Sequence, residues 1–215
     1  DIRRILAALP ARRQNLLFSA TMPKEIRRLA KRLLRDPQVV ELNHTRPLDT
    51  IEHTLFPVEG TRKFELLQRV LAEEGFISAI VFTRTKHGAN ALAKKLDRAG
   101  IRAAAIHGNK TQNARQKALE SFRRKRVTVL VATDVAARGI DIAGVTHVIN
   151  YDMPDTVDAY THRIGRTGRA HKSGEAFTFM GHEDEKLVRQ IENVIGTRIE
   201  RRHVEGFDYG PPQNS

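Results

Sequence analysis

The chain alternates between short apolar runs and amphipathic stretches along most of its length. Eight apolar runs have the length of a β-strand: Asn15–Phe18, Val39–Leu42, Ile51–Val58, Ser78–Thr83, Arg102–Ile106, Val127–Ala132, Thr146–Asn150 and Ala176–Met180. Two of them, around Ile80 and Leu130, are apolar at almost every position. Such continuous runs indicate strands that are buried on both faces of a sheet.

Three amphipathic stretches lie between these runs. Thr61–Glu74, Thr85–Ala99 and Thr111–Arg124 carry apolar residues at helical spacing. In the second stretch, Thr85 is placed as an N-cap and Gly100 as a stop signal. Helices of about 10–15 residues between buried strands predict βαβ units and a mostly parallel sheet.

The two ends of the chain differ from its middle. A helix-like segment at Ile2–Leu9 is followed by a turn at Pro10 and by the apolar Leu16-Leu17-Phe18. A strand at 15–18 needs neighbours on both sides, so we expect a piece of a longer polypeptide. An orphan strand there should pair with another copy, fold back or stay disordered. Gly206–Ser215 has the composition of a flexible tail.

Composition and charge narrow the function. The 215 residues are enough for one large domain or two small ones. The 37 Lys and Arg against 25 Asp and Glu give a net charge of +12, which favours nucleic acid as a partner over acidic proteins or membranes. The absence of cysteine excludes disulfides, Cys-ligated zinc and a Cys nucleophile. No secretory signal and no apolar run of about 18 residues is visible, so we expect a cytoplasmic protein without a membrane partner.

The segment after Val127–Ala132 combines several kinds of polar group. In open α/β sheets, ligands bind at the carboxyl ends of the strands. A hydroxyl, two carboxylates, a cation and a glycine follow this strand within nine residues: Thr133, Asp134, Arg138, Gly139 and Asp141. The alternative is ordinary, with Asp134 capping a helix and Arg138 in solvent.

A second segment carries three arginines at regular spacing. Arg163, Arg166 and Arg169 recur every three residues, so a helical or turn-like backbone would aim two or three of them to one side. Guanidinium groups match phosphate oxygens and stay charged, which suits phosphoryl transfer. Gly165 and Gly168 would let the backbone approach closely. The alternative is a solvated basic run.

Two further segments suit a nucleic-acid backbone. Thr83–Lys86 follows one apolar run, and His107–Arg115 follows another and opens a helix. Hydroxyls, amides, cations and helix N-terminal N–H groups are the usual partners of phosphate and sugar. Aromatic residues make up only 6% of the chain, so we expect backbone contacts rather than base stacking. The alternative for each segment is a capped, solvated helix start.

Other kinds of site are rejected. No window fits the P-loop pattern, and Gly168–Ser173 lacks its second glycine. The acids in Gly181–Glu185 are expected to begin a surface helix rather than bind a metal. The sequence therefore has arginines suited to phosphate but no phosphate cradle, and we expect no metal site.

In their order along the chain, these segments resemble motifs of the DEAD-box family of ATP-dependent RNA helicases. The matching elements are Ser19-Ala20-Thr21, Val81-Phe82-Thr83-Arg84, Gln112–Arg115, Thr133–Asp141, Val148–Pro154 and His162–Arg169. All but the first belong to the second of the family's two RecA-like domains. Val81–Asn90 and Ala105–Lys110 look most like the bacterial RhlE-type branch.

The resemblance implies a domain organisation. The Q-motif, the Walker A loop and the Asp-Glu-Ala-Asp motif belong to the first domain of this family, and none is found here. Residues 1–22 would be the terminal helix and strand of that first domain. Residues 23–205 would form the second, a three-layer RecA-like α/β domain with a mostly parallel central sheet flanked by helices, and 206–215 a flexible tail.

The resemblance also implies roles for individual residues. The catalytic arginine fingers on ATP would be Arg166 and Arg169. The residues near the ATP ribose and phosphates would be Gly139 and Asp141. The residues that couple the motifs would be Ser19, Thr21, Asp134, His162 and Arg163. The residues that hold RNA sugar-phosphate would be Thr83, Arg84, Gly108, Gln112, Arg115 and Thr133.

The implied function is half of an RNA-dependent ATPase and RNA unwinder. ATP with Mg²⁺ would be bound mainly by the first RecA-like domain, and this chain alone is expected to lack ATPase and unwinding activity. The partners would be RNA and the first domain, with ribonuclease or ribosome-assembly proteins as candidates and self-association through the 15–18 strand. The alternatives are an RNA- or protein-binding module without catalysis and a DNA-directed helicase domain.

Overall fold

The structure is a computed structural model that describes residues 2–19, 22, 24–40, 51–73, 75–137, 142, 145–168 and 174–209. Its contacts divide the chain into two compact units, Asp1–Asn43 and His44–Ser215. The described residues of the larger unit form seven strands: β1 (Ile51–Pro57), β2 (Ala79–Phe82), β3 (Ala103–Ile106), β4 (Val129–Ala132), β5 (His147–Asn150), β6 (Gly174–Met180) and β7 (Glu200–Arg201). Its helices are α3 (Lys63–Leu71), α4 (Lys86–Arg98), α5 (Gln112–Arg123), α6 (Asp134–Ala137), α7 (Val157–Ile164), the 3₁₀ turn η2 (His182–Asp184) and α8 (Glu185–Ile195).

The seven strands form one sheet in the order β3-β4-β2-β5-β6-β1-β7. Every pairing within it is parallel. Parallel neighbours require crossover connections, and α4, α5 and α7 supply them between successive strands. The predicted RecA-like α/β class with flanking helices is therefore confirmed, with a sheet that is parallel throughout.

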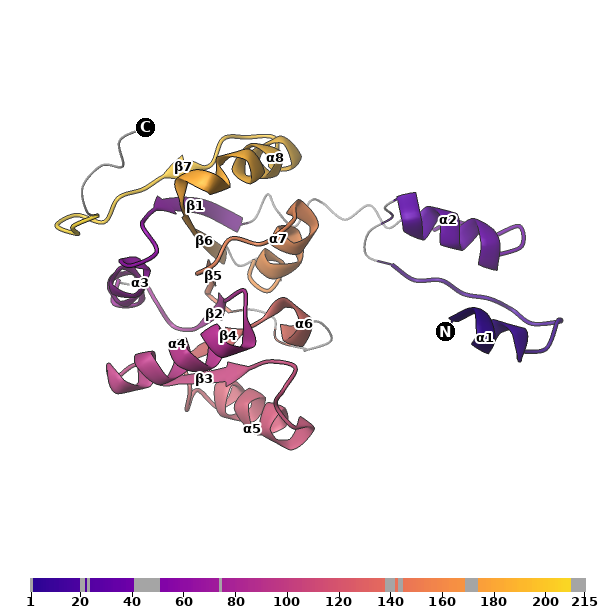
Figure 1. The fold of residues 1–215 in the computed structure, drawn as a ribbon, viewed down its shortest axis with the longest axis horizontal. Coiled ribbons are helices and arrows are strands. Elements are labelled where there is room, and N and C mark those ends of the chain that lie inside the picture. The colour runs from indigo at the N-terminus through magenta and orange to yellow at the C-terminus, as the bar shows by residue number, and fades with distance from the viewer. Residues whose placement is uncertain are drawn as a thin grey trace. The chain divides into compact units, whose positions relative to one another are not determined.

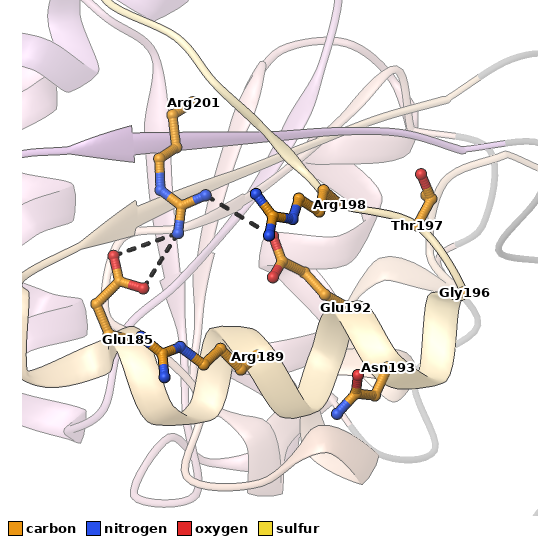
Figure 2. A pocket seen from close by; sticks show the side chains of 8 residues that line it. All are labelled: Glu185, Arg189, Glu192, Asn193, Gly196, Thr197, Arg198 and Arg201. Atoms are coloured by element: carbon orange, nitrogen blue, oxygen red, sulfur yellow. Dashed lines mark hydrogen bonds and ion pairs between the residues drawn. The ribbon is translucent and has the colours of Figure 1, made fainter.

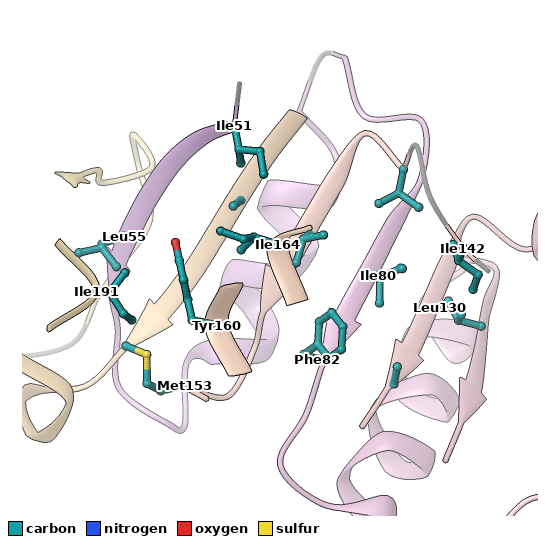
Figure 3. Close-up of a cluster of buried hydrophobic side chains, with 14 of the residues drawn as sticks. Ile51, Leu55, Ile80, Phe82, Leu130, Ile142, Met153, Tyr160, Ile164 and Ile191 are labelled. Atoms are coloured by element: carbon teal, nitrogen blue, oxygen red, sulfur yellow. The ribbon is translucent and has the colours of Figure 1, made fainter. Parts of the chain in front are cut away.

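Two hydrophobic layers enclose the sheet. Along β2, Ala79 and Val81 belong to one buried cluster and Ile80 and Phe82 to the other, as the period of two along a strand requires. Helices α3 and α4 cover the first face, and α5 to α8 cover the second (Figure 1). Figure 3 shows part of the second layer, where Tyr160 and Ile164 of α7 lie over the sheet. The apolar runs predicted strands buried on both faces, and the family resemblance implied the three layers; both expectations are confirmed.

The threonines predicted to start helices do so. The Thr85 hydroxyl accepts a hydrogen bond from the Gly88 N–H at 2.9 Å, and Thr111 caps α5 through the Ala114 N–H at 3.2 Å. Helix α4 ends at Arg98, and Gly100 beyond it has a φ of 82°. A left-handed backbone at that position favours glycine, so the predicted stop at Gly100 is also confirmed.

The smaller unit corrects one prediction. It contains α1 (Ile2–Ala7) and α2 (Lys24–Leu33), and residues 15–18 form no strand. The side chains of Leu16 and Phe18 are 68% and 89% exposed. An apolar run without a partner strand cannot satisfy its backbone groups in a sheet, so apolarity alone was not enough. The run predicted at Val39–Leu42 is not a strand at 39–40, and residues 41–42 lie outside the described ones.

The packed part of the larger unit reaches beyond residue 205. Phe207 and Tyr209 pack against the buried cluster of α3 and α4, and the Tyr209 hydroxyl accepts a hydrogen bond from the Val204 N–H at 2.7 Å. The expected tail therefore does not begin at Gly206, because two aromatic side chains anchor the next residues. The assignment of residues 1–22 to a preceding domain stays a prediction, and the smaller unit also includes α2.

Gly100→Ala isolates the cost of the left-handed turn after α4. A Cβ at Gly100 would meet no atom within 4 Å, so backbone strain alone should lower the free energy of unfolding by about 1 kcal/mol. Gly60→Ala is the matched control, because Gly60 is equally open and has no positive φ. Urea unfolding curves measure both changes, and equal stabilities of the two variants would contradict the prediction.

Candidate functional site

Four neighbouring strands end together at one edge of the sheet, called here the carboxyl edge. Phe82 of β2 is in register with Ala132 of β4 and Asn150 of β5, and Ile106 of β3 is in register with Ala132. The residues that follow these strand ends therefore emerge side by side. This edge brings together the four segments that the sequence singled out after Phe82, Ile106, Ala132 and Asn150.

The side chain of Arg163 is the centre of this edge. It is only 2% exposed, and its guanidinium binds both carboxylate oxygens of Asp134, with Nε at 2.7 Å and Nη2 at 2.8 Å. Its Nη1 donates to the Asn150 side-chain oxygen at 3.1 Å and to the Asp152 carbonyl at 2.7 Å. Because a buried cation is costly unless it is paired, these four bonds fix α7 against the ends of β4 and β5.

Asn150 and Phe82 complete the surroundings of Arg163. The guanidinium carbon lies 5.0 Å from the centre of the Phe82 ring, within the range of a cation–π contact. Asn150 is fully buried, and its amide donates to the Thr178 hydroxyl at 3.0 Å, which directs its oxygen toward Arg163. Asp134 and Arg163, both named by the sequence as coupling residues, are thus paired with each other in this structure.

Asp152 joins this network to the segment after β2. One of its carboxylate oxygens accepts a hydrogen bond from the Arg84 N–H at 2.9 Å, and the other lies 3.8 Å from the Lys63 ammonium. Its backbone carbonyl is the acceptor for Arg163. Asp152 therefore connects the backbone of Arg84, a candidate RNA-binding residue, with Arg163 of α7. Sequence reasoning named neither Asp152 nor Asn150 as a site residue.

Helix α7 is held at further points along its length. Thr156 caps it through the Ala159 N–H at 3.1 Å. The Tyr160 hydroxyl lies 2.8 Å from His53 Nδ1 of β1, and burial raises the pKa of Tyr160. After the helix, the Thr167 hydroxyl donates to the Val145 carbonyl at 2.6 Å. Helix α7 and the turn after it, which carry Arg163 and Arg166, are therefore fixed at both ends.

Arg166 lies beside Arg163 at a shallow hollow of the carboxyl edge. The hollow is also lined by Phe82, Asp134, Ala137, Ala159, His162 and Arg163. Arg166 is partly exposed. Four predicted residues, Thr21, Gly139, Asp141 and Arg169, lie outside the described residues. Ser19 belongs to the smaller unit, where its side chain is exposed.

His162 forms an ion pair within its own helix, and its predicted coupling role stays a prediction. Its Nδ1 lies 3.6 Å from the Asp158 carboxylate, one turn earlier on the same helix. This pair lies at the surface, since the two side chains are 37% and 54% exposed. The described contacts of His162 are therefore local to α7.

Three of the predicted RNA-binding residues are open to solvent. Arg84 and Gln112 are exposed, and a Cβ at Gly108 would meet no atom within 4 Å. Arg115 is partly buried, and its Nη2 donates to the Ala136 carbonyl of α6 at 3.3 Å. This bond links the start of α5 to α6, whose Asp134 pairs with Arg163.

Two of the predicted RNA-binding side chains are buried instead. Thr83 is 1% exposed, and its hydroxyl donates to the Thr85 carbonyl at 3.3 Å. Thr133 is 8% exposed, and its carbonyl accepts hydrogen bonds from the start of the α6 turn at Ala136 and Ala137. In this structure the Thr83 hydroxyl bonds within its own loop, and the Thr133 carbonyl caps the start of α6.

His107 is a buried residue that immediately precedes the exposed Gly108. It is 3% exposed, and neither ring nitrogen has a hydrogen-bond partner among the residues that the structure describes. Burial lowers its pKa, and the nearby positive charges of Lys110, Lys86 and His87 lower it further. Folding therefore favours the neutral form of the His107 imidazole over the protonated form.

A larger hollow lies elsewhere, between α8 and the segment that leads into β7 (Figure 2). Its lining is of mixed charge. The Arg201 guanidinium binds the Glu185 carboxylate at 3.1 Å and lies 3.8 Å from Glu192. These ion pairs hold β7 against α8. The hollow lies beside β7, the last strand of the sheet, and the carboxyl edge was defined at β2, β3, β4 and β5.

No group of three or more His, Cys, Asp or Glu side chains among the described residues could hold a metal ion. No helix in the described part of the chain is long and apolar enough to cross a membrane.

Comparison with known proteins agrees with the geometry. Residues 62–171 match the model of the helicase conserved C-terminal domain. The chain is 44% identical over 202 residues to the DEAD-box ATP-dependent RNA helicase CshA of Bacillus subtilis, which covers 94% of this chain and 41% of CshA. The chain thus spans less than half the length of this curated relative.

Solved structures show the same fold. Dbp5 of S. cerevisiae, bound to RNA and ADP BeF3, matches with a TM-score of 0.81 and 32% identity over 93% of this chain and 54% of that one. The E. coli DEAD-box protein SrmB, bound to the regulator of ribonuclease activity A, matches with a TM-score of 0.67 and 38% identity. That match covers 72% of this chain and 91% of the SrmB chain.

Asp134→Ala tests the pairing at the centre of the edge. Removing the carboxylate leaves the buried Arg163 without its main partner, which should lower the free energy of unfolding by about 2 kcal/mol, less than a fully buried pair because Asp134 is 34% exposed. Asp155→Ala, at an exposed carboxylate in the same region, should change it by less than about 0.5 kcal/mol. Urea unfolding measures both, and similar losses would refute the pairing argument.

The pH dependence of stability tests His107. With its pKa lowered on folding, His107 is neutral in both states above its ordinary pKa of 6.5, and the unfolded chain takes up the proton first as the pH falls. Stability should therefore decrease from pH 7 toward pH 5. His107→Leu should remove this part of the decrease and leave stability at pH 8 unchanged or higher, because two unsatisfied buried nitrogens are lost. Parallel pH curves for the two proteins would exclude this role.

Proposed function

The chain belongs to the DEAD-box family of RNA helicases as a helicase C-terminal RecA-like domain, and on that premise we propose that it supplies one side of an ATP site and one side of an RNA-binding cleft. In the proposal, the first RecA-like domain supplies the other sides. Closure of the two domains would bring the arginines to ATP and bend the bound RNA.

The observation that carries the proposal is the buried pairing of Arg163 with Asp134. It fixes α7 at the carboxyl edge, with Arg166 beside it at the open hollow. Because α7 is fixed before the substrate arrives, the backbone that carries Arg166 needs no rearrangement when its guanidinium binds phosphate. This arrangement supports Arg166 as an arginine finger, and Arg169 follows from the motif.

The nucleotide would be only half enclosed by this chain. In the proposal, Gly139 and Asp141 approach the ribose and phosphate edge, and the arginine fingers stabilise charge on the transferred phosphoryl group. In the proposal, Mg²⁺ accompanies the ATP phosphates, as it does in phosphoryl-transfer enzymes generally. The sequence carries no P-loop pattern, so the proposal assigns most of the contacts to ATP and Mg²⁺, including the phosphate cradle, to the first domain.

The RNA contacts would come from the exposed groups of the same edge. Arg84, Gly108 and Gln112 offer a cation, open backbone and an amide, which are common partners of phosphate and sugar. Arg115 would act partly through its bond to the Ala136 carbonyl. For Thr83 and Thr133 the proposal uses their loops rather than their hydroxyls. RNA appears in the solved Dbp5 complex, which supports the ligand class.

The coupling of the two ligands would run through the shared network. The Asp152 carboxylate accepts a hydrogen bond from the Arg84 N–H, and the Asp152 carbonyl accepts one from Arg163. The proposed RNA contacts and the proposed ATP contacts therefore share one hydrogen-bond network. In the proposal, Ser19, Thr21 and His162 contribute to the contact between domains. Protein partners stay a proposal as well, and the SrmB complex with a ribonuclease regulator favours that class. The RhlE-type branch also stays a prediction.

A trans-complementation assay tests the function. This chain alone should show no ATPase above background, and adding a first RecA-like domain together with RNA should produce turnover. Arg166→Ala should reduce the restored rate by about 1,000-fold, because an arginine finger contributes about that factor to phosphoryl transfer. Arg189→Ala is the control, since Arg189 is exposed on α8.

Two outcomes would contradict the proposal. Turnover by this chain alone would show that the ATP site does not need a second domain. Restored turnover that survives Arg166→Ala would exclude the arginine-finger role. RNA binding without any restored turnover would instead favour the alternative, a binding module without catalysis.

A further inference from the structure

A second basic surface lies at the opposite edge of the sheet, where β3 and β4 begin. It is formed by the end of α4 with the turn into β3 and by the end of α5 with the turn into β4. We call it the amino-edge patch, and its cations are Lys94, Lys95, Arg98, Arg102, Arg123, Arg124, Lys125 and Arg126. All eight are exposed, and Asp97 is the only acidic residue within 94–102 and 123–126.

Backbone hydrogen bonds hold the two halves of the patch together. The Arg102 carbonyl accepts from the Thr128 N–H at 3.0 Å and from the Val129 N–H at 3.1 Å. The turn after α5 is fixed by the Lys125 N–H, which donates to the Phe122 carbonyl, and by the Arg126 N–H, which donates to the Ser121 carbonyl. The cations therefore stand on an ordered scaffold rather than on a loose tail.

The patch has few partners within the chain. The side chains of Arg98, Arg102, Arg124 and Arg126 make no hydrogen bond or ion pair with the described residues. Lys95 lies 3.9 Å above the Phe64 ring, and Arg123 has contacts of its own. Exposed like charges that are gathered but not neutralised cost stability, so an anionic partner would relieve their repulsion.

The patch is separate from the carboxyl edge. Helix α5 starts at that edge with Gln112 and ends at the amino-edge patch with Arg123. Its 12 residues span about 18 Å at the rise of an α-helix. A ligand at Arg84 or Gly108 would therefore need to continue along the outside of α5 to reach the patch.

We propose that the amino-edge patch is a second RNA-binding surface, which holds phosphates of the same RNA outside the helicase motifs. The proposal rests on the proposed function for its ligand, because α5 would link a first RNA contact at Gln112 to the patch. No aromatic residue occurs within 94–102 or 123–126, so base stacking is not available and binding is to the phosphate backbone. Both single-stranded and duplex RNA carry that chemistry.

Charge substitution in this chain tests the surface. The patch variant combines Arg98→Gln, Arg102→Gln, Arg124→Gln and Arg126→Gln, which remove unpaired cations and spare Lys95, Arg123 and the left-handed Lys125. The matched control combines Arg69→Gln, Lys186→Gln, Arg189→Gln and Arg198→Gln, four exposed cations on other helices and turns. Thermal unfolding of both variants verifies that each remains folded.

Binding to a 20-nucleotide single strand and to an RNA duplex is measured by fluorescence anisotropy at several salt concentrations. The patch variant should bind both RNAs at least about 10-fold more weakly at low salt, and its log-log salt slope should fall by about 3, because each neutralised phosphate contributes about 0.7–0.9. The control should lose less than about 3-fold, as expected for net charge alone.

Three results would overturn the inference. Equal losses in the two variants would mean that only net charge matters. Unchanged RNA binding by the patch variant would exclude RNA. Binding of polyglutamate of equal charge as tightly as RNA, with the same loss in the patch variant, would point to an acidic protein instead. None of these results depends on ATPase activity, so failure of the trans-complementation assay would be a separate outcome.

Discussion

The buried guanidinium of Arg163 is the constraint on which the carboxyl edge depends. A charge with 2% exposure is tolerated only where oxygen atoms surround it, and those oxygens come from Asp134, Asn150 and Asp152. These partners follow or end two different strands, so one side chain fixes the relative positions of β4, β5 and α7. The geometry of the proposed nucleotide and RNA contacts is a consequence of satisfying that single cation.

The parallel sheet explains why one protein edge gathers so much chemistry. Every strand points the same way, so all carboxyl ends share one edge and all amino ends share the other. The helices return the chain between the edges, and α5 therefore presents Gln112 at one and Arg123 at the other. The two edges become chemically different surfaces, one with a mixed polar network and the other with gathered cations.

The pattern of apolar residues predicted most of the fold, since six of the eight proposed strands and all three proposed long helices are present. It failed at 15–18, because apolarity indicates a strand only where partner strands exist.

In the site, the spacing of arginines singled out Arg163 and Arg166, but periodicity carries no information on hydrogen-bond acceptors. Asn150 and Asp152 were missed for that reason, and the sequence signal that could have found them is a polar residue within or beside a buried strand. Burial of Thr83 and Thr133 depends on loop packing and could not be predicted from sequence.

The position of β1 has a consequence for how the domain is assembled. This strand is the first of the sheet to be synthesised, yet its neighbours are β6 and β7, and Ile51 pairs with Gly174 across more than half of the chain. Until the C-terminal segment leaves the ribosome, β1 has no hydrogen-bonding neighbour, and such distant pairings are slow to form. Completion of this sheet is therefore a late event in biosynthesis, and Leu55 and Phe56 of β1, which are buried in the folded domain, must wait for it.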